Sequence, residues 1–330
     1  MYGYGNGAAA SLLASPAWGQ PGYGGGEHAK DHHHAVRAPL QKGFLQRSNR
    51  RKMNLTPIIM SLVVPVIVFC VVFGSLSFEV HYEDPFLCYL VVFGALVVVA
   101  LCGCFAGSMA WQKHNNVERQ PNWLFFLFLS MLLAWVVGFI GGSENWAYNT
   151  FPYFRMRNLN RYTGVSPSRI RGQQIMDAGR ITFAEGSKLD VSKSMGFRNF
   201  QVYCVAPITL GNTSLDTYDF WAVGKDCCNG YSADFHCEGF NDPRALGGLR
   251  LMNDEDRAFY RLAVQQAESM YNIKATHPLF FHWVQDADAV VQDWKETGSK
   301  QFLIGSLSFF VLQAFLVATA AVAFSKLGDY

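Results

Sequence analysis

Hydrophobic residues gather in four long blocks of this chain, separated by polar segments. The blocks run approximately from Pro57 to Phe78, Phe86 to Trp111, Trp123 to Gly142 and Phe302 to Phe324, and none contains Asp, Glu, Lys, Arg or His. About 20 mostly apolar residues are needed to cross a hydrocarbon core of roughly 30 Å. A buried helix of a soluble protein rarely has this length and composition, and four in one chain are not typical. The pattern predicts a multi-pass membrane protein with four transmembrane helices.

Composition agrees with this topology. Of the 330 residues, 50% are hydrophobic and only 16% are charged, which is unusual for a cytosolic protein. We expect a disordered cytosolic tail (1–54), three spans within 55–142, a lumenal or extracellular domain (143–301), a fourth span (302–324) and a cytosolic tail (325–330). The first tail is rich in Gly, Tyr, Ala and His and lacks the hydrophobic periodicity of a folded core.

Basic residues next to the spans predict the orientation, because Lys and Arg are retained on the cytoplasmic side. They lie before the first span, between the second and third spans, and after the fourth span, which all face the same side of the membrane. They are Arg47, Arg50, Arg51, Lys52, Lys113, Arg119 and Lys326. The first loop instead carries Glu79, Glu83 and Asp84 without Lys or Arg. We therefore expect cytosolic termini, in either the plasma membrane or an endomembrane.

The eight cysteines fall into two groups. Four lie in the blocks (Cys70, Cys88, Cys102 and Cys104) and four in the long loop (Cys204, Cys227, Cys228 and Cys237). An even set in a lumenal domain predicts two disulfides. Adjacent cysteines rarely bond each other, so Cys204 is expected to pair with Cys227 or Cys228, and Cys237 with the other. A tetrathiolate zinc site is the alternative, although the spacing does not match two short ligand pairs.

The long loop changes pattern along its length. Runs of β-branched and aromatic residues predict strands at Ile181 to Ala184, Phe200 to Leu210 and Tyr218 to Val223. Later, Asn253 is expected to cap a helix, and a second helix is expected from Thr276 to about Gly298. The predicted fold class is a four-transmembrane-helix bundle with an α+β, disulfide-bonded domain between spans three and four.

Two features of this domain suggest contacts or modification. Asn212, followed by Thr213 and Ser214, is a glycosylation acceptor if the domain is lumenal. Five arginines near aromatic residues could contact an anionic lipid headgroup or an acidic partner, or form a solvated, locally paired surface. They are Arg155, Arg157, Arg161, Arg169 and Arg171.

Catalytic and metal-binding patterns are weak. His236, His277 and His282 are candidate bases, but no nucleophile elbow, zincin or phosphate-binding motif accompanies them. A histidine cluster in the first tail could hold a metal only weakly: His28, His32, His33 and His34. We expect no enzyme active site, no cofactor and no resident metal.

Within the blocks, Gln313 is the most polar side chain, so a coupled transporter with ionisable groups at depth is disfavoured. Small residues at a spacing of four could pack helices within the chain or between protomers. They are Gly103 and Gly107, Gly138 and Gly142, and Ala314 and Ala318. Cys102 and Cys104 are either inert apolar thiols or acylation sites.

The four blocks, the short first loop and the pair Cys227-Cys228 followed by Asn229-Gly230 resemble tetraspanins, whose large loop carries a Cys-Cys-Gly motif. Phe200 to Ile208, Tyr218 to Cys228 and Tyr260 to Phe281 are also similar to uncharacterised four-pass proteins of dinoflagellates. The tetraspanin resemblance implies a membrane organiser.

The sequence thus favours a non-enzymatic membrane organiser or receptor-like protein that presents its lumenal domain to other membrane proteins. We expect no nucleic-acid partner. It would lie in the lipid bilayer as a monomer or homo-oligomer. An alternative is an accessory or pore-forming subunit of a channel or transport complex, lined by Gln313 and Ser308.

Overall fold

The computed structural model describes residues 55–114, 122–211, 214–230 and 233–327. The expected cytosolic tail 1–54 with its histidines, residues 328–330 of the second expected tail, and Asn212 lie outside these residues. Four helices are long and apolar enough to cross a membrane, as the sequence predicts. They are α1 (Leu55–Ser77), α3 (Pro85–His114), α4 (Asn122–Asn145) and α7 (Ala287–Leu327).

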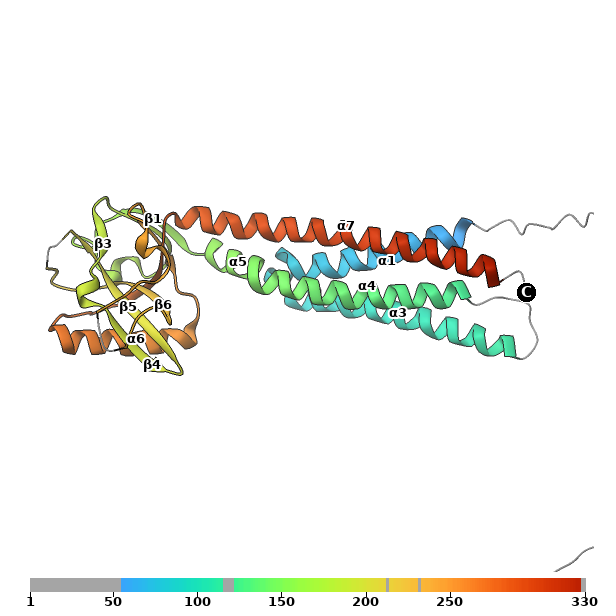
Figure 1. Ribbon diagram of the computed structural model, residues 1–330, viewed down its shortest axis with the longest axis horizontal. Helices are drawn as coiled ribbons and strands as arrows, with labels where there is room; N and C mark the ends of the chain where they lie inside the picture. The colour runs from blue at the N-terminus through green and yellow to red at the C-terminus, as the bar shows by residue number, and fades with distance from the viewer. Residues whose placement is uncertain (1–54, 115–121, 212–213, 231–232, 328–330) are drawn as a thin grey trace, which may run out of the picture. The chain divides into compact units, whose positions relative to one another are not determined.

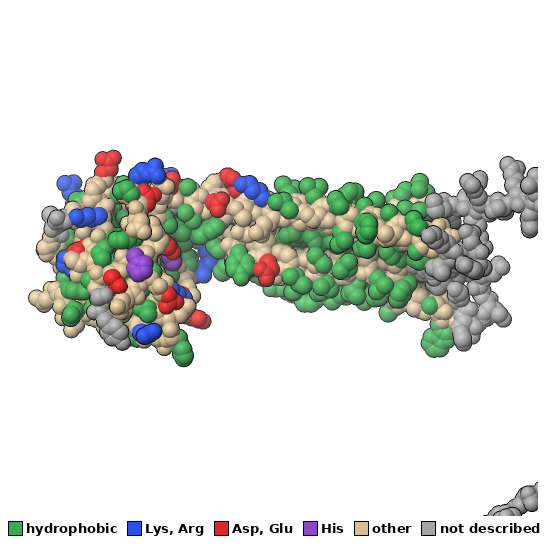
Figure 2. All heavy atoms as spheres, in the orientation of Figure 1, with side chains coloured by type: hydrophobic (Ala, Val, Ile, Leu, Met, Phe, Trp, Pro, Cys, Tyr) green, Lys and Arg blue, Asp and Glu red, His purple; other side chains and the backbone are tan. Residues whose placement is uncertain are grey.

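These four helices lie side by side in Figure 1. The rings of Phe69 in α1 and Phe309 in α7 stack with centroids 4.5 Å apart, and Trp135 Nε1 in α4 donates to Val92 O in α3 over 2.9 Å. Figure 2 shows hydrophobic side chains covering the visible face of these helices, whereas charged side chains gather on the sheet domain. An outward apolar face is what a helix needs in lipid.

Between α4 and α7 the chain forms the sheet domain, defined here as residues 160–284. Its strands are β1 (Asn160–Val165), β2 (Ala178–Phe183), β3 (Ser187–Leu189), β4 (Met195–Asn199), β5 (Gln201–Leu210), β6 (Phe220–Lys225), β7 (Gly247–Arg250) and β8 (Leu279–Val284). They are ordered β1-β2-β7-β8-β6-β5-β3, with β4 also paired to β5. The pairs β1–β2 and β6–β8 are parallel and the others antiparallel. The expected α+β domain with disulfides is therefore confirmed.

Six short helices and the longer helix α6 make up the other helical segments that the structure describes. They are α2 (Glu79–Glu83), the π-helix η1 (Trp146–Thr150), α5 (Phe151–Arg157), η2 (Gly172–Ile175), η3 (Val191–Lys193), η4 (Glu238–Asn241) and α6 (Asp254–Tyr271). As predicted, Asn253 caps α6: its side chain accepts a hydrogen bond from Glu255 N over 3.0 Å. Asn272, in the left-handed conformation, follows the last turn.

The sheet buries both of its faces, because successive side chains of a strand point to opposite sides. In β6, Phe220 and Ala222 contribute to one core, which also holds Cys204 and Cys237. Trp221 contributes to the other core, together with residues of α6. The disulfides and α6 thus lie on opposite faces of the sheet.

The helix expected from Thr276 to Gly298 is wrong at both ends. Residues 279–284 form β8 instead, since Phe281 and Phe280 fill the two cores in alternation. The helix begins only at Ala287, where Asp286 Oδ1 accepts from Asp288 N. It does not stop near Gly298 but continues to Leu327, so the expected boundary at residues 301 and 302 falls inside one helix.

Candidate functional site

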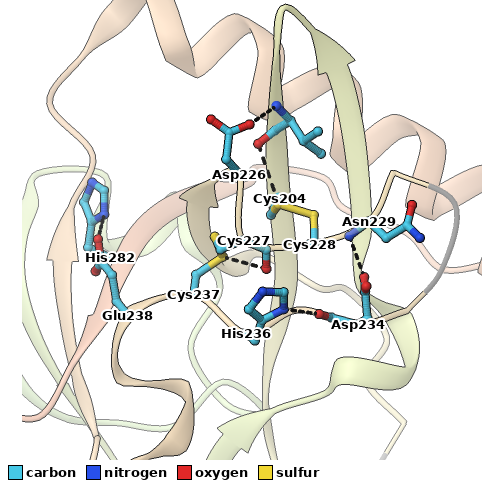
Figure 3. Close-up of a disulfide and its surroundings, with 11 residues drawn as sticks. Cys204, Asp226, Cys227, Cys228, Asn229, Asp234, His236, Cys237, Glu238 and His282 are labelled. Carbon is cyan, nitrogen blue, oxygen red and sulfur yellow. Dashed lines mark hydrogen bonds and ion pairs between the residues drawn. A yellow bond between two sulfur atoms is a disulfide. The ribbon is translucent and has the colours of Figure 1, made fainter.

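The four loop cysteines converge on one face of the sheet, and all of them are bonded (Figure 3). Cys204 pairs with Cys228, and Cys227 pairs with Cys237. The predicted absence of a bond between the adjacent cysteines is confirmed, and the structure selects one of the two pairings that the sequence left open. Because every one of these sulfurs is in a disulfide, none is a thiolate ligand for zinc.

Hydrogen bonds between side chains and the backbone hold the loop around these disulfides. Asp226, at a φ of 55°, follows β6 and accepts from Val202 N over 2.8 Å, while Asp234 accepts from Asn229 N over 2.8 Å. His236 Nδ1 lies 2.8 Å from Asp234 O. These contacts give His236 a structural role in the loop.

His282 has a side-chain partner, and His277 is held through its backbone. His282 Nδ1 lies 2.9 Å from Glu238 Oε1 (Figure 3), and the backbone N–H of His277 donates to buried Asp219 over 3.2 Å. Among the residues that the structure describes, no histidine hydrogen-bonds to a serine, threonine or cysteine side chain. The histidines therefore form no nucleophile and base pair there.

Three of the five arginines of the predicted basic stretch have partners within the chain. Arg155 Nη2 donates to Met252 O over 2.7 Å, Arg157 pairs with Glu79 at 2.8 Å, and Arg161 pairs with Asp288 at 2.7 Å. Arg169 and Arg171 are exposed further along the chain. The first three thus tie α5 and β1 to other parts of the same chain, as the locally paired interpretation expected.

A pocket of about 410 Å³ lies where the sheet meets α5 and α7. The lining residues from the two helices are Phe151, Pro152, Arg155 and Met156 of α5 and Val290 and Trp294 of α7. Those from the sheet and its connecting segments are Glu238, Leu249, Arg250, Met252, Asn253, His282 and Val284. Most of its lining is apolar, and its volume falls in the range of roughly 300–1,000 Å³ that is typical of small-molecule sites.

Arg250 is the unusual polar group of this pocket. Among the described residues it has no ion pair, and its buried Nη1 has no hydrogen-bond partner. Its guanidinium lies 5.7 Å from the ring centroid of Phe281. Burial lowers the pKa of Arg250 to about 10, and the charge of Arg257 contributes in the same direction. Sequence reasoning missed Arg250, because a single arginine between two leucines carries no pattern.

A second unusual feature is the tip of the β4–β5 hairpin. Asn199 pairs with Gln201, so Phe200 alone forms the turn. Its φ is 59°, a left-handed conformation that costs about 1–2 kcal/mol for a residue with a side chain. The phenyl ring is fully exposed. Strained backbone positions of this kind cluster at functional sites.

Polar side chains also link the helices at their sheet-domain end. Buried Asn145 donates to Gly298 O in α7 over 3.0 Å, and Asn149, in the π-helix, reaches both Asn145 Oδ1 and Gln301 Oε1 at 3.0 Å. A Cβ on Gly298 would lie 2.8 Å from the Thr150 methyl group, so this glycine allows the close approach. This network fixes α7 against η1.

Gln313 and Ser308 lie on different faces of α7. Gln313 is completely buried, and its Nε2 donates to Ser61 O in α1 over 2.7 Å. Ser308 is exposed. These two side chains therefore do not line one pore in this arrangement.

The small residues of the spans have varied surroundings. A Cβ on Gly103, Gly138 or Gly142 would lie close to Phe128, Phe69 and Leu76 respectively, so these glycines allow contacts within the chain. A Cβ on Gly107 would meet nothing within 4 Å, and Gly107 lines an apolar pocket of about 450 Å³ between α3 and α4. Ala314 is partly buried and Ala318 is exposed. Cys102 and Cys104 are free thiols.

Comparisons of the chain with protein-family models, with curated proteins and with solved structures found no match. The resemblances to tetraspanins and to dinoflagellate proteins therefore stay predictions from the sequence. Function has to be argued from this chain's own residues.

Proposed function

We propose that the protein is a non-enzymatic, receptor-like membrane protein that presents its disulfide-bonded sheet domain to partner proteins outside the cytosol. The observation that carries this proposal is Phe200, fully exposed on a strained backbone at a hairpin tip. An exposed aromatic ring supplies a large contact area at a low cost in side-chain entropy, which is why aromatic residues are enriched in protein interfaces.

The sheet domain suits such a role because the strand that carries the hairpin tip is well anchored. That strand, β5, pairs with β3, β4 and β6. The bond between Cys204 in β5 and Cys228 fixes the same strand to the loop beyond β6. A rigid support lowers the entropy that a contact residue loses on binding.

Phe200→Gly in the full-length chain tests the proposal. Glycine adopts a positive φ without strain, so the variant should fold at least as well as the wild type. We expect a photo-crosslinking amino acid at position 200 to give a discrete adduct in intact cells, and Phe200→Gly to lose that partner on purification. The matched control is Met270→Ala, which removes an exposed apolar side chain from α6.

Partner binding that is retained by Phe200→Gly, or lost equally in Met270→Ala, would contradict the proposed role of the hairpin tip. A crosslinker at position 270 that gives the same adduct would do so as well. Loss that is confined to the Phe200 variant supports it.

The expected location of the sheet domain is tested separately. We expect a glycosidase-sensitive glycan on Asn212, and loop cysteines that react with maleimide only after reduction in intact membranes. A chain without the glycan, whose loop thiols react freely, would place this domain in the cytosol and overturn the proposed orientation.

A further inference from the structure

The pocket between the sheet and α5 and α7 has apolar walls but one uncompensated charge. Phe151 and Trp294 supply aromatic surface, and Val290 and Leu249 supply aliphatic surface. Such walls favour a hydrocarbon chain or ring, because burying apolar area contributes about 25 cal/mol per Å². A purely hydrophilic ligand would gain little from them.

The charged groups of the pocket are not equally available. Glu238 lies 2.9 Å from His282 Nδ1, and Arg155 donates to the carbonyl oxygen of Met252. Arg250, in contrast, has no ion pair among the described residues, and its Nη1 is buried without a hydrogen-bond partner. The shift of its pKa comes from burial and from Arg257, both of which disfavour the charge.

A buried guanidinium is stabilised when an anion accepts its hydrogen bonds, and carboxylate and phosphate oxygens match its planar geometry. Arg155 also lines the pocket and would add a second positive charge near an anion at Arg250. The pocket therefore favours a ligand with an anionic head group attached to an apolar chain or ring.

The position of the pocket fits a ligand of this kind. Phe151 and Pro152 lie on the stretch of helix that continues from the third candidate span, and Val290 and Trp294 lie on the helix of the fourth. Trp294 precedes the apolar block that begins at Phe302 by eight residues, or about 12 Å of helix, a distance that a hydrocarbon chain directed toward the bilayer can span.

We propose that this pocket binds an anionic amphiphile, with its carboxylate or phosphate head at Arg250 and its hydrocarbon chain between Phe151, Val290 and Trp294. The ligand is either a free fatty-acid-like molecule or a phospholipid of the surrounding bilayer, and both share this chemistry. This inference does not depend on the proposed partner contact at Phe200.

The test uses the full-length chain in nanodiscs of phosphatidylcholine. One arm adds a diazirine analogue of oleic acid, and a second incorporates a diazirine analogue of phosphatidic acid. Adducts are mapped by mass spectrometry of peptides that contain Phe151 or Trp294. We expect labelling of these peptides in at least one arm; the arm that labels identifies the source of the ligand.

Arg250→Gln should lower labelling by about 10- to 100-fold, as expected for loss of a hydrogen bond to a charged group. Arg244→Gln is the matched control: Arg244 is an exposed arginine in the same domain, lies 3.6 Å from Asp242 and does not line the pocket. It should leave labelling unchanged. Val290→Trp keeps both arginines but fills the pocket, so it should abolish labelling even if Arg250→Gln folds poorly.

Three results would overturn the proposal. The first is absence of labelled pocket peptides in both arms. The second is labelling that Val290→Trp leaves unchanged or that Arg250→Gln and Arg244→Gln lower equally. The third is binding of inorganic phosphate, measured by calorimetry, without any pocket labelling, which would make the site one for a small anion rather than an amphiphile.

Discussion

Gly224 packs against the disulfides too closely for any side chain. A Cβ at this position would lie 2.6 Å from Cys227 Sγ and 2.6 Å from Cys237 Sγ, whereas non-bonded heavy atoms normally approach to about 3.5–4.0 Å. Strand β6 cannot withdraw, because it pairs with β5 and β8 and buries residues on both faces. Gly224→Ala should therefore displace the disulfide instead of the strand.

The cost can be estimated from two contributions. Overpacking a well-packed core costs about 1–3 kcal/mol. If the displaced sulfurs fail to join, the loss of the Cys227–Cys237 bond, with a sequence separation of 10, costs about 2.7 kcal/mol in the chain-entropy model. Together these come to about 4–6 kcal/mol, which is comparable with the whole stability of many domains, about 5–15 kcal/mol.

Thiol counting in the denatured, full-length protein measures this effect. The wild type should show only its four span cysteines without reductant and all eight after reduction. Gly224→Ala should show up to two more thiols without reductant, and a lower melting temperature. Gly230→Ala is the control, because its Cβ would lie 3.8 Å from Gly196 O. The reasoning is refuted if both variants give the wild-type thiol count and melting temperature.

Three further predictions concern other parts of the chain. Burial raises the pKa of the Tyr260 phenol, so the neutral phenol favours folding below the unfolded pKa of about 10, and this contribution to stability is lost at higher pH. Tyr260→Phe should therefore resist alkaline unfolding better than the wild type in a circular-dichroism titration. An unchanged midpoint would contradict this. Asp288 pairs with both Arg161 and Arg180, so Asp288→Asn should cost about 1 kcal/mol, and the loss should shrink in high salt during thermal melting. Gln313→Leu removes a hydrogen bond to α1 that is worth about 0.6 kcal/mol in membranes, but it also removes a buried, unpaired carbonyl oxygen that costs about 1–3 kcal/mol. The melting temperature of this variant in detergent should therefore not fall. A marked fall would show that the hydrogen bond to α1 dominates.

The spans and the absence of a bond between Cys227 and Cys228 could be predicted because their signals are local. An apolar block of 20 or more residues has few alternatives to a spanning helix, and the strain of a bond between adjacent cysteines removes one of the three pairings. Whether Cys204 joins Cys227 or Cys228 could not be predicted. That choice is made by the path of the loop after β6, which begins with a left-handed residue at Asp226, and no local pattern in the sequence encodes it.

Strand β8 was mistaken for a helix because its two faces are both buried. Phe280 and Phe281 fill different cores, so the segment has no alternation of polar and apolar residues, and a short apolar run does not distinguish a buried strand from a buried helix. Arg250 was missed for a different reason. Its importance comes from the pocket that distant segments build around it, and no spacing in the sequence records that.

One helix belongs to both the sheet domain and the membrane-type helices. At its first turns, Val291 packs in a buried cluster with Leu249 of β7, and further along, Phe309 stacks on Phe69 of α1. No proline interrupts α7, and the hydrogen bond from Asn145 to Gly298 O holds the first third of this helix against α4. A partner that displaces the sheet domain must therefore either shift α7 against α1 or break the contact at Gly298. The same constraint applies to a ligand beside Val290, so partner contact and pocket occupancy would act on the spans through one element.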